Sequence, residues 1–405
     1  MQSLTGTVKH YDWGSATAIP KLLHQPGDGQ PWAEYWLGTH EAGCALVDDD
    51  VPLDNWLATH DGALSGPETE AFGAHLPYLL KLLAASQPLS LQAHPSRPDA
   101  QRGFADEEAR GLALDDPTRS FKDDWPKPEL LVALAPFEAL SGFRDPSDTL
   151  DLFDALGVDD DIMRPTFGPL RYRHGAAALA EVFLDCLTLD DTRRAILTEV
   201  LAAAVRHGQD VGEVGDFARL AITLDEYYPD DPSLLAALLL NHVTLTPGQG
   251  LHNAAGVVHS YLQGVGIEIM ASSDNVLRAG LTSKHVDHAA LVSIVNFDPA
   301  PPEICDPEPD GPEIWRYPAL DPEFALWRLN PTEDDEPSPL PEPGRARIVL
   351  VTDGYINISS GGQTTELVQG QAGFVPADEH AVFTGDATAY LAGPGMLSGQ
   401  FRQIG

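Results

Sequence analysis

The spacing of apolar residues along this 405-residue chain changes twice, and this change restricts the possible folds more than any other feature of the sequence. Before residue 145 and after residue 240, apolar runs are short and are interrupted by Pro, Gly and Asp, which is typical of strands and turns. Between these positions apolar residues recur every three to four residues, as on one face of a helix. The sequence therefore predicts a mainly β protein with a helical insert.

The β regions contain short apolar runs bounded by turn residues. We expect strands at the following runs: 51–57, 79–83, 89–93, 130–134, 348–352, 355–358, 364–368, 372–375 and 389–392. Short helices are expected at 68–72 and 98–114. The segment 301–345 holds 12 prolines and many acids, so we expect an extended connector there with one strand at 324–329.

The chain is strongly acidic, with 61 Asp and Glu against 24 Lys and Arg and a formal net charge of −37. Binding to nucleic acid or to anionic lipid requires a basic surface, so we expect neither partner. The three cysteines are too few and too scattered for a disulfide framework or a thiolate zinc site. No apolar stretch resembles a signal peptide or reaches the length of a membrane span, so a cytoplasmic protein is expected.

Polar side chains alternate with aliphatic ones in the segment 88–95. Ser90, Gln92 and His94 are expected on one face of a strand, with aliphatic residues on the other. Imidazole nitrogens and amide oxygens are metal donors, so this face is a candidate lining for a metal site. A strand face exposed to solvent explains the same alternation, and this segment alone favours that interpretation.

Two more segments place ionisable side chains on apolar strands. Lys127 and Glu129 share a face of an extended segment, and Glu129 begins a buried apolar run, where a carboxylate needs a cation or a metal as its partner. A simple Lys–Glu ion pair is the alternative. Further along the chain, His259 alternates with aliphatic residues, and Glu268 does the same between two isoleucines. Arg278 lies near glycines in an expected turn and is a candidate anion ligand, with a surface Arg as the alternative.

Taken together, these segments provide a mixed set of nitrogen and oxygen donors from separate strands: Gln92, His94, Glu129 and His259. Two imidazoles, one carboxylate and one amide suit a borderline divalent ion such as Zn²⁺. With one carboxylate the site keeps a net positive charge, which suits a Lewis acid that faces sugar hydroxyls.

A series of segments resembles, in the same order, the type I phosphomannose isomerase family. The matching strings are Tyr11-Asp-Trp-Gly-Ser15, Ala33-Glu-Tyr-Trp36, Leu76-Pro-Tyr-Leu-Leu-Lys81, Leu89-Ser-Leu-Gln-Ala-His-Pro95, Lys127-Pro-Glu129, Pro136-Phe-Glu-Ala-Leu-Ser-Gly-Phe-Arg144, His259-Ser-Tyr-Leu262 and Ser273-Asp-Asn-Val-Leu-Arg-Ala-Gly-Leu-Thr282. They cover residues 9–144 and 243–295. The helical insert and the C-terminal unit resemble the family in layout more than in sequence.

The resemblance implies a fold of two cupin-type jelly-roll barrels plus an α-helical domain. Its expected division is a catalytic cupin domain in two parts, 1–144 and 241–300, a helical insert domain at 145–240, and a linker with a C-terminal cupin-like domain at 301–405. One Zn²⁺ per chain is implied, held by Gln92, His94, Glu129 and His259. A monomer is expected.

The resemblance also implies a reaction, the reversible conversion of mannose 6-phosphate to fructose 6-phosphate through a cis-enediol(ate). The implied catalytic residues are Arg278, Lys127 and Asp274. The implied substrate-binding residues are Trp13, Glu34, Lys81, Ser90, Tyr261, Glu268 and Lys284. The partner is thus a small sugar phosphate, and an acidic protein needs a local cationic pocket to bind it.

The chain departs from the family pattern at three places. The family usually has His directly before its Lys-Pro-Glu, where this chain has Pro126. The family's Thr-Pro-Lys is Thr-Ser-Lys here, and the region 247–253 also differs. Two other functions fit the residues alone: another cupin metalloenzyme such as an iron dioxygenase, which the full set of four ligands argues against, and a sugar-phosphate-binding protein without activity.

Overall fold

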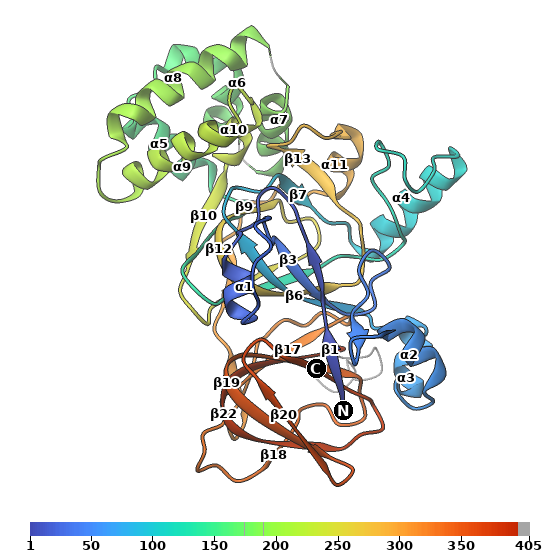
Figure 1. Cartoon of the computed structure of the whole chain (residues 1–405). Helices are drawn as coiled ribbons and strands as arrows, with labels where there is room; N and C mark the ends of the chain where they lie inside the picture. Colours follow the sequence, from blue (N-terminus) through green and yellow to red (C-terminus); the bar gives the residue numbers. More distant parts are fainter. Residues whose placement is uncertain (174, 189, 396–405) are drawn as a thin grey trace, which may run out of the picture.

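Two large antiparallel sheets form most of the molecule, and a group of helices caps one of them (Figure 1). The computed structural model describes residues 1–173, 175–188 and 190–395. The predicted class, mainly β with helices inserted, is confirmed at this level. In the described part of the chain, no helix has the length and apolar character needed to cross a bilayer.

The first sheet contains eleven strands, and its main path runs β14-β11-β8-β12-β6-β3-β2. The strands are β2 (Thr7–Lys9), β3 (Glu34–Leu37), β6 (Tyr78–Ala85), β7 (Leu91–Ala93), β8 (Glu129–Ala133), β9 (Phe137–Phe143), β10 (Leu240–Leu245), β11 (Gly250–Asn253), β12 (His259–Ala271), β13 (Leu277–Gly280) and β14 (Glu303–Cys305). The long strand β12 pairs with β6, β7, β8 and β9, so it brings most of the polar segments of the sequence onto one surface.

Six helices lie between β9 and β10 in the sequence: α5 (Pro146–Ala155), α6 (Asp160–Tyr172), α7 (Ala176–Cys186), α8 (Asp191–His207), α9 (Glu213–Tyr227) and α10 (Ser233–Ala237). Their apolar faces form one core with β7, β9 and β13, to which Leu91, Ala93, Leu277 and Ala279 contribute. Because side chains alternate along a strand, this packing turns the residues between them, Gln92 and Arg278, to the opposite face.

The second sheet also contains eleven strands. They are β1 (Gln2–Thr5), β4 (Leu46–Val47), β5 (Val51–Pro52), β15 (Glu308–Gly311), β16 (Ile314–Arg316), β17 (Ala325–Leu329), β18 (Ser338–Pro339), β19 (Arg347–Ser360), β20 (Gln363–Val368), β21 (Ala372–Val375) and β22 (Ala381–Gly393). Three of them come from the N-terminal region, because β1 pairs with both β21 and β4, and β4 pairs with β5. The N-terminus therefore lies within the C-terminal sheet (Figure 1).

Three sequence predictions about single elements need correction. The run 51–57 is mostly the helix α2 (Leu53–Thr59), which follows the two-residue strand β5. The segment 301–345 is not a connector with one strand but contributes five strands, with β14 at an edge of the first sheet and β15 at an edge of the second. Edge strands tolerate proline, and Pro309 lies in β15. The runs 348–352 and 355–358 form one strand, β19, with a register shift between Val351 and Asp353.

The remaining described helices lie outside the insert: α1 (Ala18–Leu22), α3 (Gly66–Phe72), α4 (Arg97–Ala109) and α11 (His288–Ile294). The helices expected at 68–72 and 98–114 correspond to α3 and α4. In α3, the hydroxyl of Ser65 accepts from the N–H of Glu68 and the Glu68 carboxylate accepts from the N–H of Ser65, which caps the helix start. Glu68 also accepts from the N–H of Ala346, so this cap contacts the second sheet.

Candidate metal and sugar-phosphate site

A cavity of about 570 Å³ opens on the first sheet, and most of the predicted site residues line it. Those that do are Trp13, Glu34, Lys81, Ser90, Gln92, Lys127, Glu129, Tyr261, Glu268, Asp274, Arg278 and Lys284. His94 and His259 are the exceptions. They lie directly behind Glu129, with side chains that are 1% and 0% exposed. The structure thus brings all the predicted site residues together.

His94, Glu129 and His259 form a buried cluster in which one ligand atom from each lies within 4.8 Å of the others. The Nε2 atoms of His94 and His259 are each 3.2 Å from a different oxygen of Glu129. The Nζ atom of Lys127 is 2.9 Å from Glu129 Oε1. Burial raises the pKa of Glu129, but the nearby His94 and Lys127 hold it well below its usual value.

The outer nitrogen of each imidazole fixes the orientation of its ring. His94 Nδ1 is 2.7 Å from the carbonyl oxygen of Asn275, and His259 Nδ1 is 3.0 Å from that of Val257. A carbonyl only accepts, so each Nδ1 carries the hydrogen, and in the neutral ring the Nε2 lone pair points into the cluster. Burial lowers the pKa of His94 to about 4, which keeps its ring neutral.

One direct observation indicates that these residues can hold a divalent metal ion. The buried His94 Nε2 has no hydrogen-bond partner in the described part of the chain, although it is surrounded by polar groups. A buried nitrogen lone pair without a hydrogen-bond donor is suited to bind a metal ion. Two imidazoles with a carboxylate are a ligand set that zinc prefers. Gln92 is placed to contribute as well, since it pairs with His259 across β7 and β12 and lines the cavity.

A second buried charge group lies on the other side of the cavity. Lys81 is the charged residue in a strand, β6, that is otherwise apolar and buried on both faces. Its Nζ atom is 2.8 Å from Glu268 Oε2 and 3.3 Å from Glu34 Oε1. Burial alone lowers the pKa of Lys81, but these two carboxylates raise it above its ordinary value, so the amine stays charged.

Arg278 and Lys284 differ from Lys81 because neither has an acidic partner among the described residues. The positive charge of Arg278, together with burial, lowers the pKa of Lys284, which indicates that the two cations are close together. The structure places Arg278 in the strand β13 rather than in the expected turn, opposite Gln92 of β7. Two cations without a carboxylate partner in a chain of net charge −37 form a local site for an anion.

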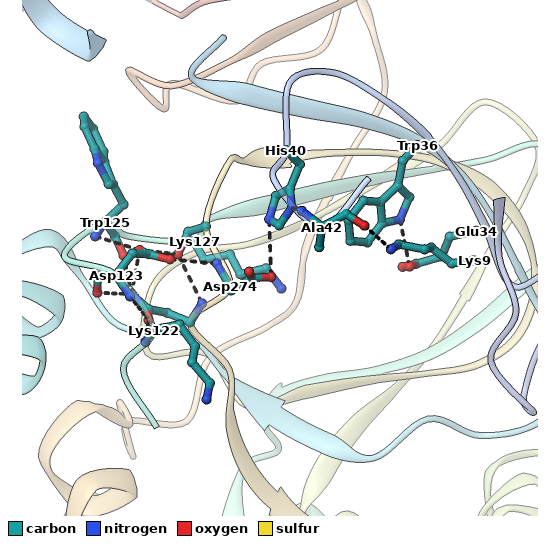
Figure 2. A network of polar contacts seen from close by, with 12 residues as sticks. Lys9, Glu34, Trp36, His40, Ala42, Lys122, Asp123, Trp125, Lys127 and Asp274 are labelled. Atoms are coloured by element: carbon teal, nitrogen blue, oxygen red, sulfur yellow. Dashed lines mark hydrogen bonds and ion pairs between the residues drawn. The ribbon is translucent and has the colours of Figure 1, made fainter. Parts of the chain in front are cut away.

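Sequence reasoning missed several residues of this cavity. His40 and Trp36 lie on one wall, and Asp123 and Asn275 hold the loop that carries Asp274 (Figure 2). His40 stands alone in a loop after β3 without a periodic pattern around it. Asn275 belongs to one of the matching strings. Its side chain donates to Asp123 and Trp125, and its backbone oxygen accepts from His94. No spacing rule reveals a contact made through the main chain.

The chain is similar to known proteins over most of its length. The family model described as phosphomannose isomerase type I, catalytic domain, matches residues 1–146. The mannose-6-phosphate isomerase of Escherichia coli (strain K12) is 34% identical over 391 residues, which cover 94% of this chain and 96% of that protein. The chain belongs to the type I phosphomannose isomerase family.

Other members of the family resemble the chain over nearly its whole length. The mannose-6-phosphate isomerase of Salmonella typhimurium (strain LT2) is 35% identical over 394 residues, covering 94% of this chain and 96% of that one. A crystal structure of a mannose 6-phosphate isomerase bound with zinc and yttrium superimposes with a TM-score of 0.88 at 32% identity, covering 98% of this chain and 100% of that chain. The similarity therefore includes the helices and the second sheet as well as the cavity.

Proposed function

We propose that this chain is a zinc-dependent aldose–ketose isomerase that interconverts mannose 6-phosphate and fructose 6-phosphate through a cis-enediol(ate). The observation that carries the proposal is the His94–Glu129–His259 cluster, with an unpartnered imidazole nitrogen, at the base of a cavity with unpaired cations. Membership of the type I phosphomannose isomerase family selects this reaction over an iron dioxygenase or a binding protein without activity.

His94, Glu129 and His259, with Gln92 beside them, would hold one Zn²⁺ per chain. When bound, the ion supplies a Lewis acid that polarises sugar oxygens and stabilises negative charge on them. The carbonyls of Asn275 and Val257 fix the two imidazoles, so the ligands are positioned before the metal enters. This arrangement needs no redox cofactor, because the isomerisation moves protons only.

Lys284 is proposed to bind the phosphate, together with Ser90, whose hydroxyl lines the same cavity. Lys81 is already neutralised by Glu34 and Glu268, so we assign it to the sugar hydroxyls, together with Glu34, Glu268 and Tyr261. Trp13 stacks on Tyr11 at 5.7 Å between ring centroids and offers an apolar wall at the cavity rim.

In the reaction itself, a proton leaves C2 of the sugar and returns to C1, while a hydroxyl proton is lost at O2 and gained at O1. Lys127 is proposed as an acid/base group for these transfers, because its amine contacts Glu129 and faces the cavity. Asp274 is proposed as a second proton acceptor. Arg278, beside Gln92, adds a fixed positive charge close to the oxygen that becomes negative.

We also propose that the two sheets are cupin-type jelly-roll barrels and that the helices α5–α10 form a separate domain inserted into the first barrel. The pairing of the long strand β12 with β6, β7, β8 and β9, and the single core that joins the helices, support this description.

The test combines zinc analysis of the purified chain with a coupled assay for isomerisation of mannose 6-phosphate. We expect about one zinc per chain and turnover that disappears on chelation and returns with added zinc. Zinc-loaded protein that binds sugar phosphate without turnover would identify a binding protein instead. Bound iron together with oxygen uptake would identify a dioxygenase.

A further inference from the structure

A buried histidine outside the metal cluster contacts a carboxylate at the cavity wall. His40 follows β3, its side chain is 7% exposed, and its Nε2 atom is 3.3 Å from Asp274 Oδ1 (Figure 2). Asp274 is 55% exposed and lines the cavity. The pair therefore joins a rigid buried ring to a carboxylate that bound substrate can reach.

The backbone determines which nitrogen of His40 carries the hydrogen. The N–H of Ala42 donates to His40 Nδ1 at 3.2 Å, so Nδ1 is the acceptor. In the neutral ring Nε2 therefore carries the hydrogen and donates to Asp274. The ring cannot easily turn, because it packs edge-on against Trp36 at 5.0 Å between centroids. Lys9 also anchors the loop, since its Nζ atom donates to the carbonyl of Ala42 at 2.5 Å.

Asp274 is fixed from its main chain as well. Its N–H donates to Asp123 Oδ2 at 2.9 Å, and the next residue, Asn275, accepts from the metal-site His94. Burial raises the pKa of Asp274, but the hydrogen bond of His40, with the charges of Lys127 and Lys81, lowers it overall. The second oxygen, Oδ2, has no hydrogen-bond partner in the described part of the chain, so it is available to the substrate.

Among the described residues that line the cavity, His40 carries the only imidazole. This is significant because the chain has Pro126 where family members usually have a histidine. We propose that His40 is a positioning residue, whose Nε2–H hydrogen bond holds the Asp274 carboxylate in one orientation with Oδ2 directed at a hydroxyl of the bound sugar. The proposal rests on the proposed isomerase function and adds to it a residue that orders the proton acceptor.

The test uses two substitutions of His40 in the zinc-loaded full-length chain. His40→Leu removes the donor and is expected to lower kcat/KM about 10- to 100-fold, the effect of losing one hydrogen bond to a charged group. His40→Gln keeps an N–H donor on a side chain of similar reach, and it is expected to recover most of that loss. His60→Leu is the matched control, because His60 also stacks on a tryptophan, Trp56, but outside the cavity, and it should leave kcat/KM unchanged.

A double-mutant cycle separates positioning from packing. In the Asp274→Asn background, His40→Leu should cause little further loss, because the carboxylate on which it acts is absent. Equal losses in the Leu and Gln variants, or a full additional loss in the Asp274→Asn background, would mean that His40 only packs against Trp36. Zinc content and the thermal midpoint of each variant identify a general loss of structure.

A measurement without turnover tests the hydrogen bond itself. In ¹⁵N-labelled protein, the imidazole of His40 should appear as the Nε2–H tautomer, and its Nε2–H signal should move in Asp274→Asn. An Nδ1–H tautomer would overturn the inference even in an active enzyme. Absence of turnover in the zinc-loaded wild-type chain would instead contradict the proposed function, and the spectrum would still decide the His40–Asp274 contact.

Discussion

The contacts of the two histidines of the candidate metal site and of Lys81 indicate what each buried polar side chain can do. His94 and His259 each place Nδ1 against a backbone carbonyl and leave Nε2 facing Glu129. Lys81 is paired with two carboxylates, which neutralise its positive charge. Arg278, like Lys284, lacks an acidic partner among the described residues, so its charge is available to the substrate.

Replacing Arg278 by Ala should abolish measurable turnover while leaving zinc bound. The reason is that Arg278 adds charge to the cavity from β13 but is not one of the residues proposed to hold the metal. Zinc content and coupled-assay kinetics of the same preparation check this. Arg316→Ala is a suitable control, because Arg316 lies over Trp327 in the second sheet at 5.5 Å from the ring centroid. Loss of zinc from Arg278→Ala would contradict the role given to this residue.

Side-chain alternation in several segments, together with the family resemblance, predicted the residues of the candidate metal site, but it could not predict the residues that support them. Gln92 and His94, and likewise Lys127 and Glu129, share faces of short strands, and a period of two is visible in the sequence. His40 has no such pattern, and Asn275 acts through its carbonyl oxygen. Their importance depends on which distant segments the fold brings beside them, and that information is not local.

At the scale of elements, β11 carries a contact that links the two sheets. His252 on β11 is 2.6 Å from Glu303 Oε2 on β14 and 2.8 Å from Asp321 Oδ2, which lies before β17 of the second sheet. Burial lowers the pKa of His252, but the hydrogen bonds and charges of Asp321 and Glu303 raise it to about 9. The imidazolium thus stays charged between two carboxylates at neutral pH.

This contact predicts a specific dependence of stability on pH. The pKa of His252 is raised on folding, so its contribution is complete below its unfolded value of about 6.5 and is lost as the pH rises through about 9. Its size is at most about 3 kcal/mol. Urea unfolding of the wild type and of His252→Leu at pH 6, 8 and 10 should give a difference that is largest at pH 6 and small at pH 10. A difference that stays constant across this range would contradict the ionic contact.

Helices and strands were predicted best where apolar residues recur with a regular period over a long segment. The helical insert was found because long amphipathic patterns are unambiguous, and in α8 the acidic start at Asp190 and the final Arg206 and His207 also agree. The segment 301–345 was misjudged because proline is a poor strand former except at edges, and a sequence does not reveal which strands will be edges. The run 51–57 is too short for its apolar pattern to distinguish a helix from a strand.

At the scale of the whole molecule, the net charge is −37, yet most of the lysine side chains gather in the cavity. Lys81, Lys122, Lys127 and Lys284 all line the cavity, which takes four of the six lysines of the chain. The remaining surface therefore carries a large excess of negative charge. The negative side chains repel one another in the folded state, and this repulsion lowers the stability of the fold.

Salt should consequently stabilise the protein at neutral pH. The thermal midpoint should rise between about 10 mM and 1 M NaCl, since the screening length falls from about 30 Å to 3 Å over this range. Calorimetry at pH 7.5 and at pH 5 checks the cause. The gain should be much smaller at pH 5, which is nearer to the sequence pI of about 4.4. An equal gain at both values would mean that charge repulsion is not responsible.

The position of β1 has a consequence for the order in which the protein is made. Gln2 pairs with Phe374, so an interval of synthesis separates β1 from its partner strand β21. At synthesis rates of about 5–20 residues per second, that interval is roughly 20 to 70 seconds. All described strands of the first sheet are complete by Cys305, so this sheet can assemble during translation. The edge of β1 that pairs with β21 remains open meanwhile, and an open strand edge can pair with another chain.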